Sequence, residues 1–348
     1  MRRTRWLAVP VMLILVAGCS FGPSSVTVDA VDGAGPTMDA VPSSVPSSKA
    51  ADPDNDGFTP AAAEAAVLSD PVASAASRPG ESMVWIPAGD HEVPGTLALP
   101  TNPTDRPVPV VLMLHGDLSS RDENGGLFAR QAAALAADGI ASLRIDFAGS
   151  GDSTEPDLAL NYPDMVGDAV ASLDYLRSDD RLDSTRVAVL GLSRGGAIAA
   201  TLAGTRPGVA ALVEWSGAVY NGYDEEPDLH DQARIDGYVE LGPDPGGFRL
   251  SLSWFDTIEQ SHPLTDVTGY TGPVLAITGS EDQVVPPTTS DVLVQAVAST
   301  DTTRDVIDGA DHEYQATSDD QTDADEVIRL TDQWLISRLD GGGAQSPG

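Results

Sequence analysis

A serine stands at the centre of a short glycine-rich motif, Gly191-Leu192-Ser193-Arg194-Gly195. An apolar run precedes the motif and a helical spacing of apolar residues follows it, which predicts a sharp turn from a strand into a helix. Such a turn exposes the hydroxyl of Ser193, and the flanking glycines let the two backbones approach each other. A serine hydroxyl is a strong nucleophile only when a base removes its proton. The motif therefore requires a base elsewhere in the chain.

A histidine and an acid that can complete such a site stand later in the chain. The histidines are His91, His115, His230, His262 and His312. Of these, His312 follows the last expected strand, and Asp282 lies in the loop after the strand before it, with Glu281 as the alternative acid. Taken alone, a loop histidine or one acid among 53 acidic residues carries little information. Because Ser193, Asp282 and His312 each follow their own strand, they can meet at one edge of a parallel sheet as nucleophile, orienting acid and base.

A second short motif, His115-Gly116-Asp117, follows a continuous apolar run over residues 108–114. A strand at that position would bring the motif to the same edge of the sheet as Ser193. We expect the backbone N–H groups of Asp117 and Arg194 to bind the negatively charged oxygen that develops when the serine attacks. We expect His115 to be structural, since it precedes the serine in the chain.

The elements that must position these residues alternate between strands and helices. A hairpin is expected over residues 83–99. Further strands are expected at 108–114, 141–147, 187–192, 210–215, 274–278 and 303–307. Helices are expected within 127–135, 165–176, 197–202 and 323–339. This alternation predicts the α/β class, with a mostly parallel sheet and helices on both of its faces.

Together the motifs resemble the α/β-hydrolase superfamily, most closely its bacterial feruloyl/cinnamoyl-esterase-like and acylaminoacyl-peptidase-like members. The matching pieces are the His115-Gly116-Asp117 motif, the loop 146–153, the serine motif, the loop 279–286 and the segment 309–312. The resemblance implies an α/β-hydrolase fold with an N-terminal antiparallel hairpin and a small cap inserted at residues 217–262. It also implies the cleavage of carboxylic esters through an acyl-enzyme. Two positions depart from the pattern of these relatives, which often carry a bulky apolar residue at Asp117 and Gln or Met at Arg194.

The expected cap is rich in aromatic side chains. It contains six of the chain's 18 aromatic residues: Tyr220, Tyr223, Tyr238, Phe248, Trp254 and Phe255. Two interpretations are open: they pack the cap onto the core, or some of them line an acyl or aryl pocket.

The N-terminal residues have the pattern of an export signal. Three arginines within the first five residues are followed by an apolar run over residues 6–17, which is too short for a membrane span. The run ends in Val16-Ala17-Gly18-Cys19, which resembles the bacterial lipobox, whose cysteine is lipidated. An ordinary signal peptide or an uncleaved anchor is the alternative. We therefore expect a lipoprotein signal peptide over residues 1–18, lipid on Cys19, and a protein anchored to the outer face of the bacterial cell membrane.

The rest of the chain divides into three expected parts. Residues 19–80, rich in Ser, Pro and Ala, are expected to form a flexible tether. Residues 81–340 form the expected hydrolase domain, and 341–348 a disordered tail. Within the tether, residues 52–57 resemble the start of a calcium loop, but the twelfth position of that loop is Ala63 instead of an acid, which favours a simple acidic turn.

The composition limits the partners. The formal net charge of −34 opposes binding to nucleic acid. The single cysteine excludes an intrachain disulfide framework and a cysteine-based zinc site. No metal and no organic cofactor are expected. The expected partners are a small-molecule ester and, through the lipid, a membrane, while the oligomeric state is open.

Two other functions are open on the sequence alone. The same triad would also serve a peptidase, an amidase or a thioesterase, because only the acyl group differs. The chain could instead be a non-catalytic lipoprotein that binds ligands at the cell surface.

Overall fold

A computed structural model describes residues 78, 80–100, 102, 106–222, 227–241 and 248–339, which belong to one compact unit. The signal peptide, Cys19, the acidic turn at 52–57, nearly all of the tether and the tail at 341–348 lie outside the described residues, as does Tyr223. Across the described ranges, none of the helices has both the length and the apolar character needed to cross a membrane.

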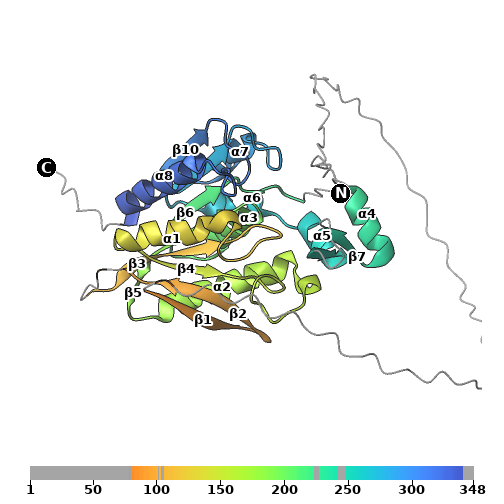
Figure 1. Cartoon of the computed structure of the whole chain (residues 1–348), viewed down its shortest axis with the longest axis horizontal. Coiled ribbons are helices and arrows are strands. Elements are labelled where there is room, and N and C mark those ends of the chain that lie inside the picture. Colours follow the sequence, from red (N-terminus) through yellow and green to blue (C-terminus); the bar gives the residue numbers. More distant parts are fainter. Residues whose placement is uncertain are drawn as a thin grey trace, which may run out of the picture. The chain divides into compact units, whose positions relative to one another are not determined.

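An eight-stranded sheet forms the centre of this unit, with the strand order β1-β2-β4-β3-β5-β6-β9-β10 (Figure 1). The strands are β1 (Glu81–Ala88), β2 (His91–Ala98), β3 (Val108–Leu114), β4 (Ala141–Ile145), β5 (Leu182–Leu192), β6 (Val209–Trp215), β9 (Val274–Gly279) and β10 (Thr302–Ile307). The β1–β2 hairpin is antiparallel, β2 is antiparallel to β4, and all other neighbours are parallel. The predicted hairpin, the mostly parallel sheet and the α/β class are therefore confirmed.

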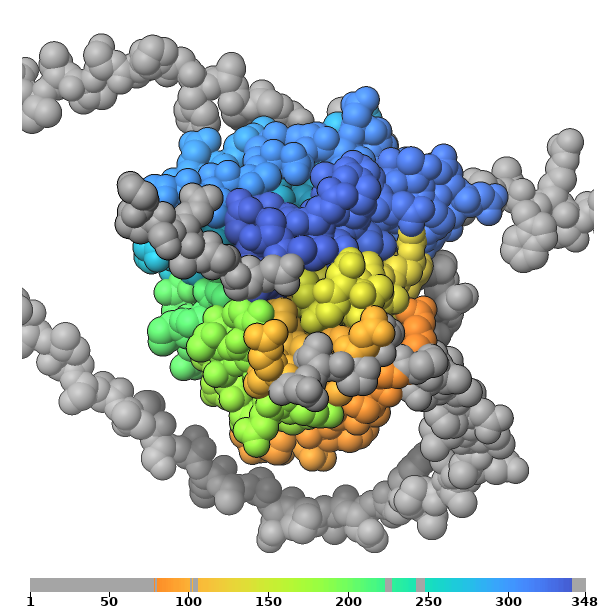
Figure 2. Space-filling view, turned by 90° about the vertical axis from the view of Figure 1, so that its left-hand side faces the viewer, coloured from red at the N-terminus to blue at the C-terminus, as the bar shows by residue number. Residues whose placement is uncertain are grey.

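Helices cover both faces of the sheet, as its apolar central strands require. Every residue of β3 is buried, which fits a strand enclosed between two helical layers. One face carries α1 (Leu127–Ala137) and α8 (Thr322–Leu339), which lie next to each other on the surface shown in Figure 2. The other face carries α2 (Tyr162–Ser178), α3 (Arg194–Thr205) and α7 (Thr288–Ala296). All but α7 were predicted.

Local sequence signals explain where these helices begin and end. The side chain of Asn161 accepts a hydrogen bond from the N–H of Asp164 and so caps α2. Gly139, with φ of +86°, follows the end of α1 in the left-handed conformation that glycine adopts without strain. Short 3₁₀ turns lie at η1 (Asn124–Gly126), η2 (Asp157–Ala159) and η3 (Val267–Gly269).

A small group of elements is inserted between β6 and β9, within the segment expected to form the cap. It consists of α4 (Pro227–Asp236), β7 (Tyr238–Leu241), β8 (Phe248–Ser251) and α5 (Leu252–Glu259), and α6 (Pro263–Asp266) follows it. The strands β7 and β8 form a separate antiparallel pair. Trp254 and Phe255 of α5 are both buried, which agrees with the packing interpretation for these two aromatic residues, whereas Tyr238 is exposed.

Candidate active site

Ser193 lies at the turn between β5 and α3, with φ of +53° and ψ of −120°. A positive φ is strained for a residue with a side chain, so other contacts must hold it. Two backbone hydrogen bonds do so: the N–H of Ser193 donates to the carbonyl of Trp215 (2.9 Å), and its own carbonyl accepts from the N–H of Ala218 (3.0 Å). The end of β6 therefore fixes the turn that presents the serine.

The glycines around Ser193 are required by close backbone contacts. A Cβ on Gly191 would collide with the carbonyl of Gly195, and a Cβ on Gly195 would collide with the carbonyl of Leu114 at the end of β3. A Cβ on Gly116 would lie only 3.2 Å from the Cβ of Ser193. The loop after β3 therefore runs directly beside the serine, as the prediction for the oxyanion hole requires.

Asp282 and His312 are in direct contact. The N–H at Nδ1 of His312 donates to Oδ2 of Asp282 across 2.9 Å. The other carboxylate oxygen of Asp282 accepts from the N–H groups of Val284 (2.9 Å) and Val285 (2.8 Å). The Asp282 side chain is fully buried, while that of His312 retains 14% exposure. This arrangement fixes the imidazole through Nδ1 and leaves Nε2 without a hydrogen-bond partner among the described residues.

Ser193 follows β5, Asp282 follows β9 and His312 follows β10, so all three lie beyond the carboxyl ends of parallel strands. In the described part of the chain, no hydrogen bond joins the Ser193 hydroxyl to His312. Catalytic hydrogen bonds are often long in the absence of substrate and shorten in the reacting complex. The contact between Asp282 and His312 is therefore observed, and the complete triad stays a prediction.

Glu123 anchors the loop after β3, although no sequence motif singles it out. Its carboxylate accepts hydrogen bonds from the N–H of Gly116 (2.6 Å) and the hydroxyl of Ser119 (2.6 Å). Burial raises the pKa of Glu123 to about 7, against the lowering effect of these two hydrogen bonds. Glu123 thus holds the residue that directly precedes Asp117.

Asp117 and Arg194, the two positions that depart from the pattern of the related hydrolases, are in direct contact in the structure. Nε of Arg194 donates to Oδ2 of Asp117 across 3.1 Å. The Arg194 side chain is only 2% exposed, and its guanidinium lies 5.6 Å from the ring centroid of Trp254 in α5, a cation–π distance. The two expected oxyanion residues are therefore tied to each other and to the cap segment.

His115 is structural, as expected. Its Nδ1–H donates to the carbonyl of Gly116 (2.7 Å), and its Nε2 accepts from the N–H of Phe147 (3.2 Å). Complete burial lowers the pKa of His115, so the neutral ring that these two bonds require is favoured. The histidine thus joins the loops after β3 and β4.

His91 also has a structural partner. Its Nε2 lies 2.8 Å from Oδ1 of the buried Asp168, whose other oxygen accepts from the N–H of Ala148. The pair joins β2, α2 and the loop that follows β4. His262 stands at the N-terminus of the short α6.

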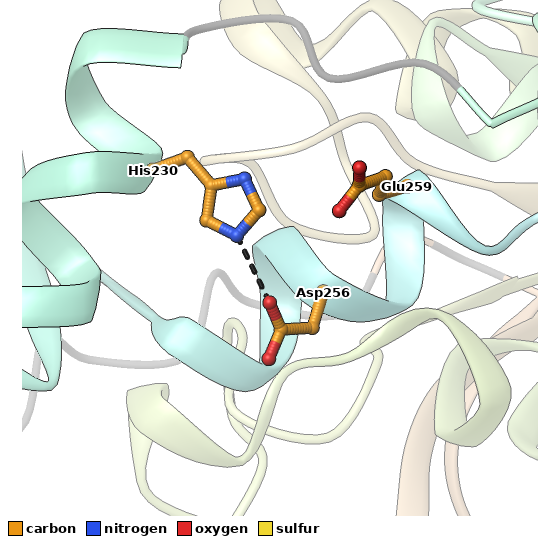
Figure 3. A group of neighbouring side chains, drawn as sticks. All are labelled: His230, Asp256 and Glu259. Atoms are coloured by element: carbon orange, nitrogen blue, oxygen red, sulfur yellow. Dashed lines mark hydrogen bonds and ion pairs between the residues drawn. The ribbon is translucent and has the colours of Figure 1, made fainter.

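A third histidine lies in a group that has the composition of a metal site. His230, Asp256 and Glu259 each offer one ligand atom within 4.8 Å of the others (Figure 3). However, Arg234 donates to Nδ1 of His230 (3.3 Å), so the proton of the neutral ring is on Nε2, which donates to Asp256 (2.9 Å). A neighbouring guanidinium also opposes a bound cation. We therefore interpret this group as a hydrogen-bonded contact between α4 and α5. The expectation that the protein binds no metal stays a prediction.

Comparison with known proteins agrees with this fold. The sequence profile of a family described as serine aminopeptidase, S33, matches residues 105–234, which include Asp117 and Ser193 but not Asp282 or His312. Two uncharacterized proteins from strains of Mycobacterium tuberculosis are 28% identical over 191 residues, which make up 55% of this chain. The match spans 58% of the length of these relatives.

Several solved structures share the architecture. Est1E from Butyrivibrio proteoclasticus with bound ferulic acid has a TM-score of 0.60 and 19% identity, over 74% of this chain and 99% of that one. DcsB in complex with a substrate analogue has a TM-score of 0.63 and 17% identity, over 75% and 100%. A monoacylglycerol lipase from Paleococcus ferrophilus has a TM-score of 0.53 and 21% identity, over 67% and 97%. These likenesses establish the α/β-hydrolase fold, so the predicted fold class is confirmed.

Proposed function

We propose that this protein is a serine hydrolase that cleaves carboxylic esters through an acyl-enzyme. The observation that carries the proposal is the contact between His312 and the fully buried Asp282, at the sheet edge where Ser193 stands in its strained turn. A histidine oriented by a buried acid is the base that a serine nucleophile needs.

The proposed reaction has two halves. His312 Nε2 removes the proton of Ser193 while Oγ bonds to the acyl carbon, and the tetrahedral intermediate then expels the alcohol, which receives that proton from His312. Water, activated by the same histidine, attacks the acyl carbon and releases the acid and free Ser193. The backbone N–H groups of Asp117 and Arg194 bind the oxyanion. Arg194 is the first residue of α3, where the N–H groups lack helical partners and the helix dipole is positive.

The test replaces the nucleophile. Ser193→Ala should lower kcat on p-nitrophenyl esters by about 10⁶, the typical cost of losing a triad nucleophile. It should also abolish labelling by a fluorophosphonate probe. Ser178→Ala, an exposed serine at the end of α2, is the matched control and should retain both activities. Full activity in Ser193→Ala would refute the proposal, and wild type that the probe fails to label would support a non-catalytic binding protein.

A second candidate differs in the bond that is cleaved. The matching family profile is named for serine aminopeptidases, which favours an amide or peptide substrate. The bound ferulic acid of Est1E favours an aryl ester instead. A panel of p-nitrophenyl esters, a feruloyl ester, an acyl thioester and aminoacyl amides, compared by kcat/KM, decides among esterase, thioesterase and peptidase.

We further propose that the protein is exported and held at the outer face of the bacterial cell membrane by lipid on Cys19. Removal of residues 1–18 would change the formal net charge from −34 to −37, because three arginines and no acid are lost. Such a charge is repelled by anionic headgroups, so lipid would have to provide the anchor. Cys19→Ser should move the protein from the detergent phase to the aqueous phase in Triton X-114 partition. An unchanged distribution would refute the anchor.

A further inference from the structure

Arg194 and Asp117 form an ion pair that is largely withdrawn from water. The exposed fraction is 2% for the Arg194 side chain and 18% for Asp117, and their Nε and Oδ2 atoms are 3.1 Å apart. Burying a guanidinium is costly unless charges and hydrogen bonds compensate it. The ring of Trp254 on α5 adds a second favourable contact at 5.6 Å. The buried charge is therefore held by groups from two other parts of the chain, the loop after β3 and α5.

The position of this pair gives it a specific consequence. Its two members are the residues whose backbone N–H groups form the proposed oxyanion hole. A carboxylate on one of the two donor residues repels the negative charge that develops on the substrate oxygen, and this repulsion is strong where water is excluded. The guanidinium of Arg194 neutralises that carboxylate.

The pair also fixes the donor segment mechanically. The N–H of Gly116 is held by Glu123 at 2.6 Å, and the side chain of the next residue, Asp117, is held by Arg194 at the start of α3. The N–H of Asp117 lies between these two attachments. Donors that are fixed before the reaction need no reorganisation when the oxyanion forms, which is the basis of their effect on rate.

We propose that Arg194 is a positioning residue that aligns the oxyanion hole through the side chain of Asp117, cancels its charge, and ties the hole to the cap through Trp254. This rests on the proposed serine hydrolase function. Asp117 and Arg194, the two positions that depart from the family pattern, then act together to stabilise the transition state.

The proposal predicts an asymmetry between the two partners. Arg194→Met removes the positive charge while keeping a long side chain, and should lower kcat by about 10², the lower end of the cost of losing one oxyanion donor. Asp117→Asn removes the repulsive charge and keeps a hydrogen-bond acceptor, so kcat should fall by less than about tenfold. The double variant Asp117→Asn/Arg194→Met should regain about tenfold over Arg194→Met alone, because the two effects are coupled.

The decisive readouts separate the transition state from the ground state. For Arg194→Met, KM should change little, while the inhibition constant of a trifluoromethyl ketone, which forms a tetrahedral oxyanion with the serine, should rise in parallel with the loss of kcat. Arg194→Lys, which retains charge without the planar fork, should lie between wild type and Arg194→Met. Thermal unfolding checks that each variant is folded.

The matched control is Arg186→Met, within β5 and seven residues before Ser193. Arg186 is paired with Asp183 and donates to the carbonyls of Leu339 and Pro107. This variant also loses an ion pair, though a more exposed one, and its kcat should stay at the wild-type value.

Equal losses in Arg194→Met and Asp117→Asn, with no recovery in the double variant, would overturn the inference, as would a kcat of Arg194→Met within twofold of wild type. If Arg194→Met does not fold, the affinity of Asp117→Asn and of Arg194→Lys for the ketone decides the question by the same criterion. Wild type that lacks hydrolase activity would instead overturn the proposed function, so the two failures are distinguishable.

Discussion

Two histidine–aspartate pairs in this protein have the same 2.9 Å contact and opposite patterns of burial. In the pair at the sheet edge, the Asp282 side chain is fully buried and that of His312 is 14% exposed. In the pair that joins α4 and α5, the His230 side chain is fully buried and that of Asp256 is 45% exposed. The distance between the groups alone therefore does not indicate whether either pair can take part in proton transfer.

The difference lies in what contacts the second nitrogen of each ring. Nδ1 of His230 accepts from Arg234, and its ring stacks on Phe255 with centroids 5.2 Å apart. Nε2 of His312 has no hydrogen-bond partner among the described residues, and Ser193 stands at the same sheet edge. A buried acid and an accessible imidazole permit proton transfer, whereas a buried imidazole bonded at both nitrogens is suited to holding two helices together.

The sharpest test of this comparison replaces the two histidines in parallel. His312→Gln should lower kcat on p-nitrophenyl esters by about 10⁶, since removal of the base costs about as much as removal of the nucleophile. His230→Gln should keep most of its kcat and lose thermal stability, because a buried, fully hydrogen-bonded ring is disturbed. Initial-rate kinetics and thermal unfolding of both variants give the comparison. A kcat loss of similar size in His230→Gln would contradict the distinction.

Replacing the acids of the two pairs should give the same contrast in kcat, with a smaller difference than for the histidines. Asp282→Asn should lower kcat by about 10⁴, the typical effect when the orienting acid no longer holds the imidazole in its working tautomer. Asp256→Asn, on the half-exposed acid, should leave kcat near wild type. Steady-state kinetics on one ester measures both variants. The distinction fails if Asp282→Asn is as active as Asp256→Asn.

Much of this architecture was predictable because the strands have strong local signals. The strand 108–114 was predicted with its observed bounds, and the predicted order of motifs at the strand ends agrees with the sheet. The helix α7 was missed because it buries few apolar residues, chiefly Leu293, and has no side chain capping its N-terminus. The strands β7 and β8 are four residues each, too short for an alternating pattern.

The site was predictable to the extent that each of its residues follows a strand. Ser193, Asp282 and His312 satisfy that rule, and the structure brings the last two into contact. The contact between Asp117 and Arg194 joins residues 77 positions apart, and the cation–π contact with Trp254 depends on how the cap segment folds back. Such contacts arise from tertiary packing and have no local sequence signal.

Glu214 on β6 provides a further contrast, between two buried acids. Asp282 accepts three hydrogen bonds within 2.9 Å. The carboxyl of Glu214 is reached by Ser290 at 3.5 Å, and its Oε1 has no hydrogen-bond partner in the described residues. Burial raises the pKa of Glu214 from 4.5 to about 8, so this group should be protonated at neutral pH.

The sign of the resulting pH dependence follows from the direction of that shift. Between pH 4.5 and 8 the folded state binds a proton on Glu214 that the unfolded state has released, so the free energy of unfolding falls as the pH rises through this window. Glu214→Gln removes this dependence while keeping the size of the neutral acid. The free energy of unfolding of Glu214→Gln, relative to that of wild type, should therefore increase with pH. Between the two pKa values the increase is about 1.4 kcal/mol for each pH unit.

Urea unfolding of wild type and Glu214→Gln at pH 5, 7 and 9 measures this difference. Glu123, whose pKa is also raised by burial, is present in both proteins, so its contribution cancels in the comparison. A stability difference that is constant over this range would mean that Glu214 is ionised in the folded state and that burial does not raise its pKa. The sparse hydrogen bonding of Glu214 would then not be enough to keep this buried acid protonated.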